Sequence, residues 1–176
     1  MKKLIDYINE KLVINKNTKV FSNVPKDKAE LNYIINQLIS ERGWNADLND
    51  IDVSNITDMS KLFEDLDMFN GDISDWDVSS VKNMNEMFAG AKEFNCDISK
   101  WDVSNVKYMN GMFKGATEFN QDISGWDVSS VVDMNEMFID TFMFNQDLSK
   151  WNVSNVISKM FVFLNSGCKS QNRPKF

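Results

Sequence analysis

A 25-residue repeat fills most of this 176-residue sequence. The segment from residue 98 to residue 120, ISKWDVSNVKYMNGMFKGATEFN, recurs when it is shifted by 25 positions in either direction. Tryptophans mark the period, and an isoleucine stands at the same place one repeat earlier: Trp76, Trp101, Trp126, Trp151 and Ile51. A fixed period of roughly 20–50 residues is typical of repeat architectures. Because one unit cannot bury its apolar side chains alone, the repeats must stack on one another.

Each repeat carries two apolar patterns in succession. Trp101 and Val103 alternate with polar residues, which predicts a strand with one buried face. Ser104 follows at a position suited to a helix N-cap. The next apolar residues are spaced as on one face of a helix: Val106, Met109, Met112, Phe113 and Ala116. Gly115 lies near the end of this segment, where a helix commonly ends at a glycine. We therefore predict an α/β solenoid of leucine-rich-repeat-like coils, each a strand plus a short helix, with the strands in a parallel sheet.

The sequence divides into three predicted regions. Residues 1–46 form a helical N-terminal cap, residues 47–166 form about five repeats, and residues 167–176 form a polar basic tail. A cap is expected because the first coil of a repeat stack would otherwise expose its apolar end. It would contain one helix within residues 2–14 and a second helix that begins after Asp27, ends at Gly43 and buries Leu31, Ile34, Ile35, Leu38 and Ile39.

The repeat also resembles a known family. The run D-[IL]-S-x-W-D-V-S-[NS]-V-x-x-M-x-x-M-F-x-x-A-x-x-F-N is similar to the BspA-like leucine-rich repeats of bacterial surface proteins and mycoplasma lipoproteins. The similarity extends over about residues 47–164 and involves many positions in register. It implies a binding or adhesive role and brings no catalytic residues.

The charge of the chain is unevenly distributed. The formal net charge is −7, but residues 71–150 carry 14 acidic and 6 basic side chains, a net charge of −8. The charged side chains of residues 151–176 are all basic. Since nucleic-acid backbones are bound by Lys and Arg, the acidic body argues against nucleic acid as a direct ligand and favours a basic surface on a protein partner.

One aspartate recurs at the same place in successive repeats and predicts an acidic stripe: Asp52, Asp77, Asp102 and Asp127. Neighbouring carboxylates in such a stripe repel one another, so something must offset the repulsion. Two interpretations remain open. Each carboxylate accepts nearby Ser or backbone groups at a turn, or the stripe binds a basic partner or a cation.

The last two repeats break the polar pattern of the preceding ones. Apolar residues replace polar ones or surround the last predicted helix: Val132, Ile139, Phe142, Met143, Ile157, Phe161, Val162 and Leu164. Large exposed apolar patches usually mark contacts. We therefore predict a hydrophobic interface, most simply that of a twofold homodimer. In the alternative, residues 166–176 fold back over this surface with Phe176 as the anchor.

Catalytic signals are absent from the sequence. It has no histidine, two cysteines (Cys96 and Cys168), and no phosphate-binding loop, metal-ligand spacing or nucleophile signature. We therefore predict a protein that is not an enzyme and needs no cofactor or metal. Its first residues, MKKLI, begin like a signal peptide, but Asp6, Asn9, Glu10 and Lys11 interrupt the apolar stretch, which predicts a cytoplasmic protein without membrane contact.

Three functions fit these observations. The first is a soluble, acidic scaffold that binds another protein. The second is an acidic inhibitor, of the kind a phage or mobile element would use, that occupies the basic channel of a nucleic-acid-binding enzyme by mimicking nucleic acid. The third, which rests on the family resemblance, is a surface adhesin.

Overall fold

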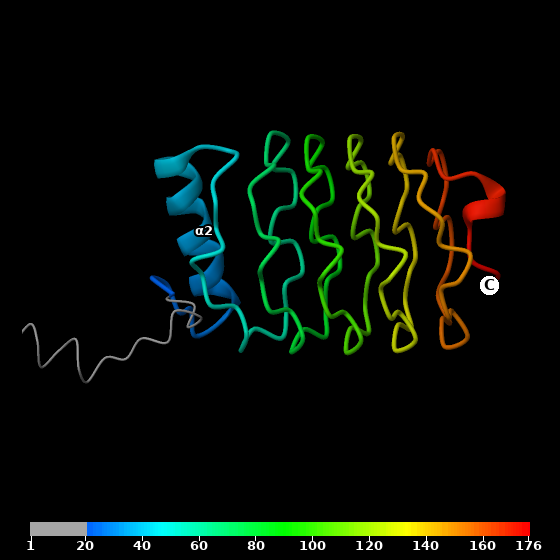
Figure 1. Ribbon diagram of the computed structural model, residues 1–176, viewed down its shortest axis with the longest axis horizontal. Helices are drawn as coiled ribbons and strands as arrows, with labels where there is room; N and C mark the ends of the chain where they lie inside the picture. Colours follow the sequence, from blue (N-terminus) through cyan, green and yellow to red (C-terminus); the bar gives the residue numbers. More distant parts are fainter. Residues whose placement is uncertain (1–20) are drawn as a thin grey trace, which may run out of the picture.

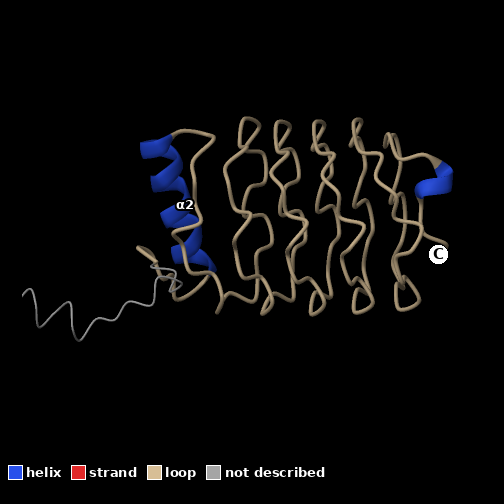
Figure 2. Ribbon diagram, viewed as in Figure 1, coloured by secondary structure: helices blue, strands red, loops and turns tan. Residues whose placement is uncertain are grey.

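The computed structural model describes residues 21–176, which form a row of stacked coils. Helix α2 (Lys28–Arg42) lies at one end of the row and the C-terminal segment at the other (Figure 1). The C-terminal segment contains a short 3-10 helix, η1 (Ser170–Asn172). In residues 21–176 the remaining chain consists of turns and single bridges, without a continuous strand (Figure 2). The helix predicted within residues 2–14 lies outside the described residues.

Helix α2 begins and ends where the sequence predicts. The Asp27 side chain accepts a hydrogen bond from the Glu30 N–H at 2.9 Å, and the Glu30 carboxylate accepts one from the Lys26 N–H, also at 2.9 Å. Gly43 ends the helix with a φ of 86°. The buried face belongs to the same hydrophobic core as the coils: Leu31, Ile35, Leu38 and Ile39. No helix in residues 21–176 is long and apolar enough to cross a membrane.

The predicted α/β solenoid of strand-plus-helix coils is wrong. The segment around Trp101 is not a strand, and the segment from Ser104 to Gly115 is not a helix. Equivalent residues of successive coils instead form isolated parallel bridges, such as Asn83 with Tyr108, within the segments that were predicted to be helical. The protein is therefore a stack of turn-rich coils, with neither a parallel sheet on one side nor a layer of helices on the other.

Two residues of every coil have a backbone conformation that prevents a helix. In the second coil they are Glu86 and Gly90, with φ of 55° and 72°, and in the third Gly111 and Gly115, with φ of 57° and 70°. A right-handed helix needs a negative φ at every residue. Most of the equivalent positions are not glycines, so the sequence gives little warning: Lys61, Asp65, Glu86, Glu136, Asp140, Phe161 and Asn165.

Backbone hydrogen bonds alternate between two directions in these segments. The N–H groups of the even-numbered residues Met84 to Gly90 donate to carbonyls of the following coil at 2.7–2.9 Å. The N–H groups of Met87, Ala89 and Ala91 donate to the carbonyl three residues earlier. In an α-helix every N–H would instead reach the carbonyl four residues earlier. Within this segment the ladder between coils is directional, because its N–H groups all donate toward the C-terminal end, whereas the N–H groups of Lys82 and Glu93, on either side of it, donate to the preceding coil.

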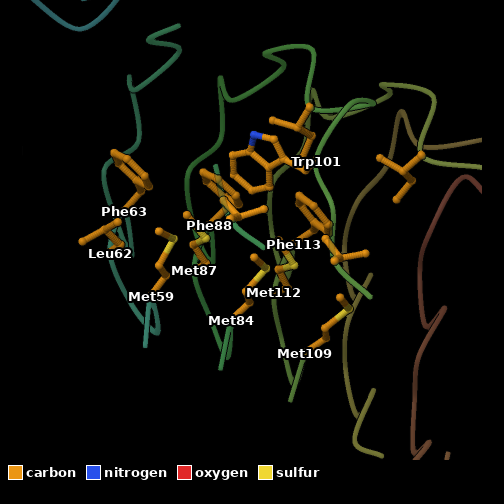
Figure 3. Close-up of a cluster of buried hydrophobic side chains, with 14 of the residues drawn as sticks. Met59, Leu62, Phe63, Met84, Met87, Phe88, Trp101, Met109, Met112 and Phe113 are labelled. Atoms are coloured by element: carbon orange, nitrogen blue, oxygen red, sulfur yellow. The ribbon is translucent and has the colours of Figure 1, made fainter. Parts of the chain in front are cut away.

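Columns of identical side chains form the core between the coils. Phe63, Phe88 and Phe113 stack in one such column, with ring centroids 5.4 and 5.7 Å apart (Figure 3). Trp101 is 4 % exposed, and its Nε1–H donates to the Ile73 carbonyl at 3.2 Å. The predicted inward orientation of the Trp, Met and Phe columns is therefore confirmed, although the backbone that carries them differs from the prediction.

Candidate interaction surfaces

Asp52, Asp77, Asp102 and Asp127 form a row along the coils, here called the Asp row. In each of them Oδ1 accepts the backbone N–H of the serine two residues later, at 3.0–3.1 Å. Asn152 holds the same place in the last coil and accepts the Ser154 N–H at 3.2 Å. These bonds fix the turn, as one of the two interpretations predicts. They use one carboxylate oxygen, and the side chains of the last three members of the row are exposed.

Hydrogen bonds and neighbouring charges have opposite effects on the pKa values of carboxylates in the Asp row. Hydrogen bonds from the Ser104 hydroxyl and backbone N–H lower the pKa of Asp102, and the neighbouring Asp127 works in the opposite direction. The Ser129 hydroxyl and N–H likewise lower the pKa of Asp127. Because the hydrogen bonds prevail, these carboxylates are charged at neutral pH.

Lysines neutralise other carboxylates of the coils but not the Asp row. Each of three lysines lies within 2.7 Å of a carboxylate: Lys61 with Glu86, Lys92 with Asp67, and Lys114 with Glu136. No member of the Asp row forms an ion pair with a residue in the described part of the chain. Within residues 21–176 the row therefore presents negative charge without a paired cation.

A second set of polar columns is structural. Asn70, Asn95 and Asn120 each accept, through Oδ1, the backbone N–H of the equivalent asparagine of the next coil at 2.9–3.0 Å. A parallel series of aspartates accepts serine N–H groups in the same way as the Asp row: Asp72, Asp97, Asp122 and Asp147. Among residues 21–176, no group of three or more Asp, Glu, Cys or His side chains is arranged to hold a metal ion.

The eight residues of the predicted hydrophobic interface do not form one continuous exposed surface. Ile139 and Val162 are buried and Val132 is half-buried. Five are exposed, Ile157 most of all at 82 %: Phe142, Met143, Ile157, Phe161 and Leu164. The predicted patch is thus partly covered by the protein itself.

The tail folds back over the last coil. The Lys169 N–H donates to Asn145 Oδ1 at 3.0 Å, and the Leu148 N–H donates to the Asn172 carbonyl at 2.7 Å. The Arg173 guanidinium lies 5.1 Å from the centroid of the Phe163 ring, and Pro174 is buried. Phe176, the anchor in the fold-back alternative, is 44 % exposed. The hydrogen bonds of Lys169 and Asn172, together with Arg173 and Pro174, therefore hold the tail in place. Phe176 contacts Lys159, whose Nζ lies 5.6 Å from the ring centroid, but it is not a buried anchor.

A groove of about 460 Å³ remains between the last coil and the tail. Lys159 and residues 161–165 form one wall, and Arg173, Pro174 and Phe176 form the other. Sequence reasoning named Phe161, Val162 and Leu164 here but missed the basic residues of the groove. The sequence does show that residues 151–176 contain basic and no acidic residues, but the pattern does not indicate which of them lie beside the apolar residues.

Comparison with protein families identifies the family to which the repeats belong. Residues 30–138, and again residues 101–175, match the family described as Mycoplasma protein of unknown function, DUF285. The chain belongs to the DUF285 family. No curated protein and no solved structure matches the chain. The DUF285 match agrees with a mycoplasma-type repeat family, the coarser part of the resemblance drawn from the sequence.

Proposed function

We propose that this DUF285 protein is a non-enzymatic binding module whose Asp row contacts a basic surface on a protein partner. The observation that carries the proposal is that no cation among residues 21–176 pairs with the row, although lysines pair with carboxylates elsewhere in the coils. The resemblance to BspA-like repeats supports the same class of function, because it implies binding or adhesion.

The structural contribution of the Asp row can be separated from its charge. Asn152 shows that an asparagine at this position accepts the same serine N–H. Replacing Asp77, Asp102 and Asp127 together by Asn should therefore preserve the turns while it removes three negative charges. Alanine at the same positions would remove the acceptor as well, so it would test the turn and not the charge.

The test compares the triple Asn variant with a control of equal net charge. Glu41→Gln, Glu93→Gln and Glu118→Gln together neutralise three exposed carboxylates outside the Asp row. Proteins captured from mycoplasma lysate by the wild type are identified by mass spectrometry, and a purified partner is then titrated by calorimetry at several salt concentrations. We expect the Asn variant to bind more weakly, with a smaller salt dependence, and the Gln control to bind more tightly than the Asn variant.

The identity of the partner distinguishes the functions. A basic structural or signalling protein supports the scaffold. A nucleic-acid-binding enzyme that the protein inhibits supports nucleic-acid mimicry. Equal affinities of the wild type and the Asn variant, with both folded, would remove the Asp row from the binding surface.

A further inference from the structure

The last coil ends the ladder with unpaired donors. In the fourth coil, four N–H groups donate to carbonyls of the last coil at 2.8–3.0 Å: those of Met134, Glu136, Phe138 and Asp140. The equivalent groups of the last coil have no hydrogen-bond partner within residues 21–176: those of Lys159, Phe161, Phe163 and Asn165. These four N–H groups are called the donor row below. The outer edge of the last coil therefore lacks the acceptors that every earlier coil receives.

The groove described above runs beside the donor row. All four residues of the donor row contribute to its lining, together with Leu164 and, across the groove, Phe176. Phe161, Leu164 and Phe176 are exposed. The site thus combines an open backbone edge with apolar walls, a combination that suits an extended peptide better than a compact polar ligand.

The charges around the groove indicate which kind of ligand would complement it. Lys159 and Arg173 line the groove, and Lys169 and Lys175 belong to the same acid-free segment. Neither groove cation forms an ion pair with a described residue. Unpaired N–H groups carry partial positive charge and add to the same field. Carboxylates are the complementary groups.

We propose that the groove binds an acidic, extended segment of a partner protein, which adds to the last coil along the donor row. Carbonyls of that segment accept the four N–H groups, an apolar side chain enters the groove, and carboxylates pair with Lys159 and Arg173. This surface is separate from the Asp row and opposite to it in charge.

A second copy of the chain fits the site less well. A twofold arrangement would place donor row against donor row and Lys159 and Arg173 near their own counterparts, so like charges would meet. A head-to-tail arrangement would need the carbonyl edge of the first coil. Helix α2 lies at that end of the stack (Figure 1).

The test uses a fluorescent peptide with the sequence VVDMNEMFIDT, residues 131–141 of the chain. In the structure, carbonyls of this segment accept the N–H groups of the third coil at 2.7–3.0 Å, so the peptide is an acidic mimic of a following coil. Anisotropy should show saturable binding that weakens as salt is added. The neutral peptide VVNMNQMFINT should bind about tenfold more weakly.

Two variants of equal charge locate the site. Lys159→Glu should weaken binding of the acidic peptide about tenfold, whereas Lys107→Glu, at an exposed lysine of the third coil, should leave it within about twofold. The Asn variant of the Asp row should bind the peptide as the wild type does. The proposal for the Asp row and the proposal for the donor row can therefore be refuted independently.

Amide hydrogen exchange gives a readout that does not depend on variants. In the free protein, the N–H groups of Phe161 and Phe163 should exchange faster than those of Glu136 and Phe138, and saturating peptide should slow them. Absence of binding, or binding that leaves these amides unprotected, would overturn the proposal. Protection without peptide, accompanied by a dimeric mass in light scattering, would also overturn it and would assign this end to self-association.

Discussion

Gly111→Ala distinguishes the observed coil from the predicted helix, because the substitution should lower the free energy of unfolding in the coil and raise it in a helix. In the middle of a helix, alanine is more favourable than glycine by about 1 kcal/mol. In the structure, Gly111 has a φ of 57°, where a Cβ costs about 1–2 kcal/mol. Restriction of the unfolded chain by alanine returns about 0.4–1 kcal/mol. We expect a net loss of about 1 kcal/mol in the free energy of unfolding.

A Cβ at Gly111 would meet one close neighbour, which must move slightly to admit it. An added Cβ would lie 3.2 Å from Cγ of Glu86, the movable side chain of the preceding coil. Glu86 itself has a positive φ at the equivalent position, so a side chain there is compatible with folding. The variant should therefore fold, with a lower midpoint in urea unfolding followed by circular dichroism.

Gly125→Ala is the matched control. Gly125 is exposed and does not have a positive φ, and an added Cβ would have no atom within 4 Å. Alanine there should be neutral or stabilising by up to about 1 kcal/mol. If Gly111→Ala were as stable as the wild type or more stable, while Gly125→Ala behaved as expected, the left-handed position would be refuted.

Three further predictions concern stability. Trp101→Ala should cost about 3–5 kcal/mol in urea unfolding because it empties a buried column, whereas the same change at Trp44, which is 40 % exposed, should cost less than about 1 kcal/mol. Asn95→Ala should cost about 1 kcal/mol, because a backbone N–H of the next coil loses its acceptor; a loss below the error of the measurement would count against the asparagine ladder. The hydrogen bonds from Arg42 hold the pKa of Asp50 at about 2, below its ordinary value of 3.8, so its contribution is fully present above that value and is lost as pH falls toward 2. Arg42→Gln should reduce this loss in acid-titrated unfolding, and an unchanged acid profile would contradict the pairing.

The inward columns could be predicted from the sequence because a stack forces identical positions into identical environments. Trp101, Met109 and Phe113 recur at the repeat period, and all three are buried. The same reasoning could not give the backbone. Apolar residues spaced by three and four positions satisfy one face of a helix, and they equally satisfy a coil whose N–H groups alternate between the next coil and the carbonyl three residues back.

Of the two proposed binding surfaces, the sequence could predict the one made of side chains but not the one made of backbone N–H groups. The Asp row was visible as a repeated residue, but the sequence left open whether it fixes a turn or binds a partner, and the serine N–H bonds that show the turn come from the structure. The donor row was not visible, because it consists of backbone N–H groups whose direction depends on the left-handed residues. Glu86 and Asp140 occupy such positions without a sequence signal for them.

The directional ladder makes the two ends of the stack chemically different. Along the segment that contains the left-handed residues, each coil donates its N–H groups to the next, so the last coil ends in unpaired donors there. Elsewhere in the coils the direction is reversed, as the N–H groups of Val132 and Ile157 show by donating to the preceding coil. At the C-terminal end the tail covers the core with side chains, through Arg173 over Phe163 and the buried Pro174, and its backbone supplies no acceptor to the donor row. Carbonyls or carboxylates are the groups that would complement this edge, since unpaired donors and cations both carry positive charge. The cover therefore protects the apolar core while it leaves the edge open, which is the arrangement that an added acidic segment requires.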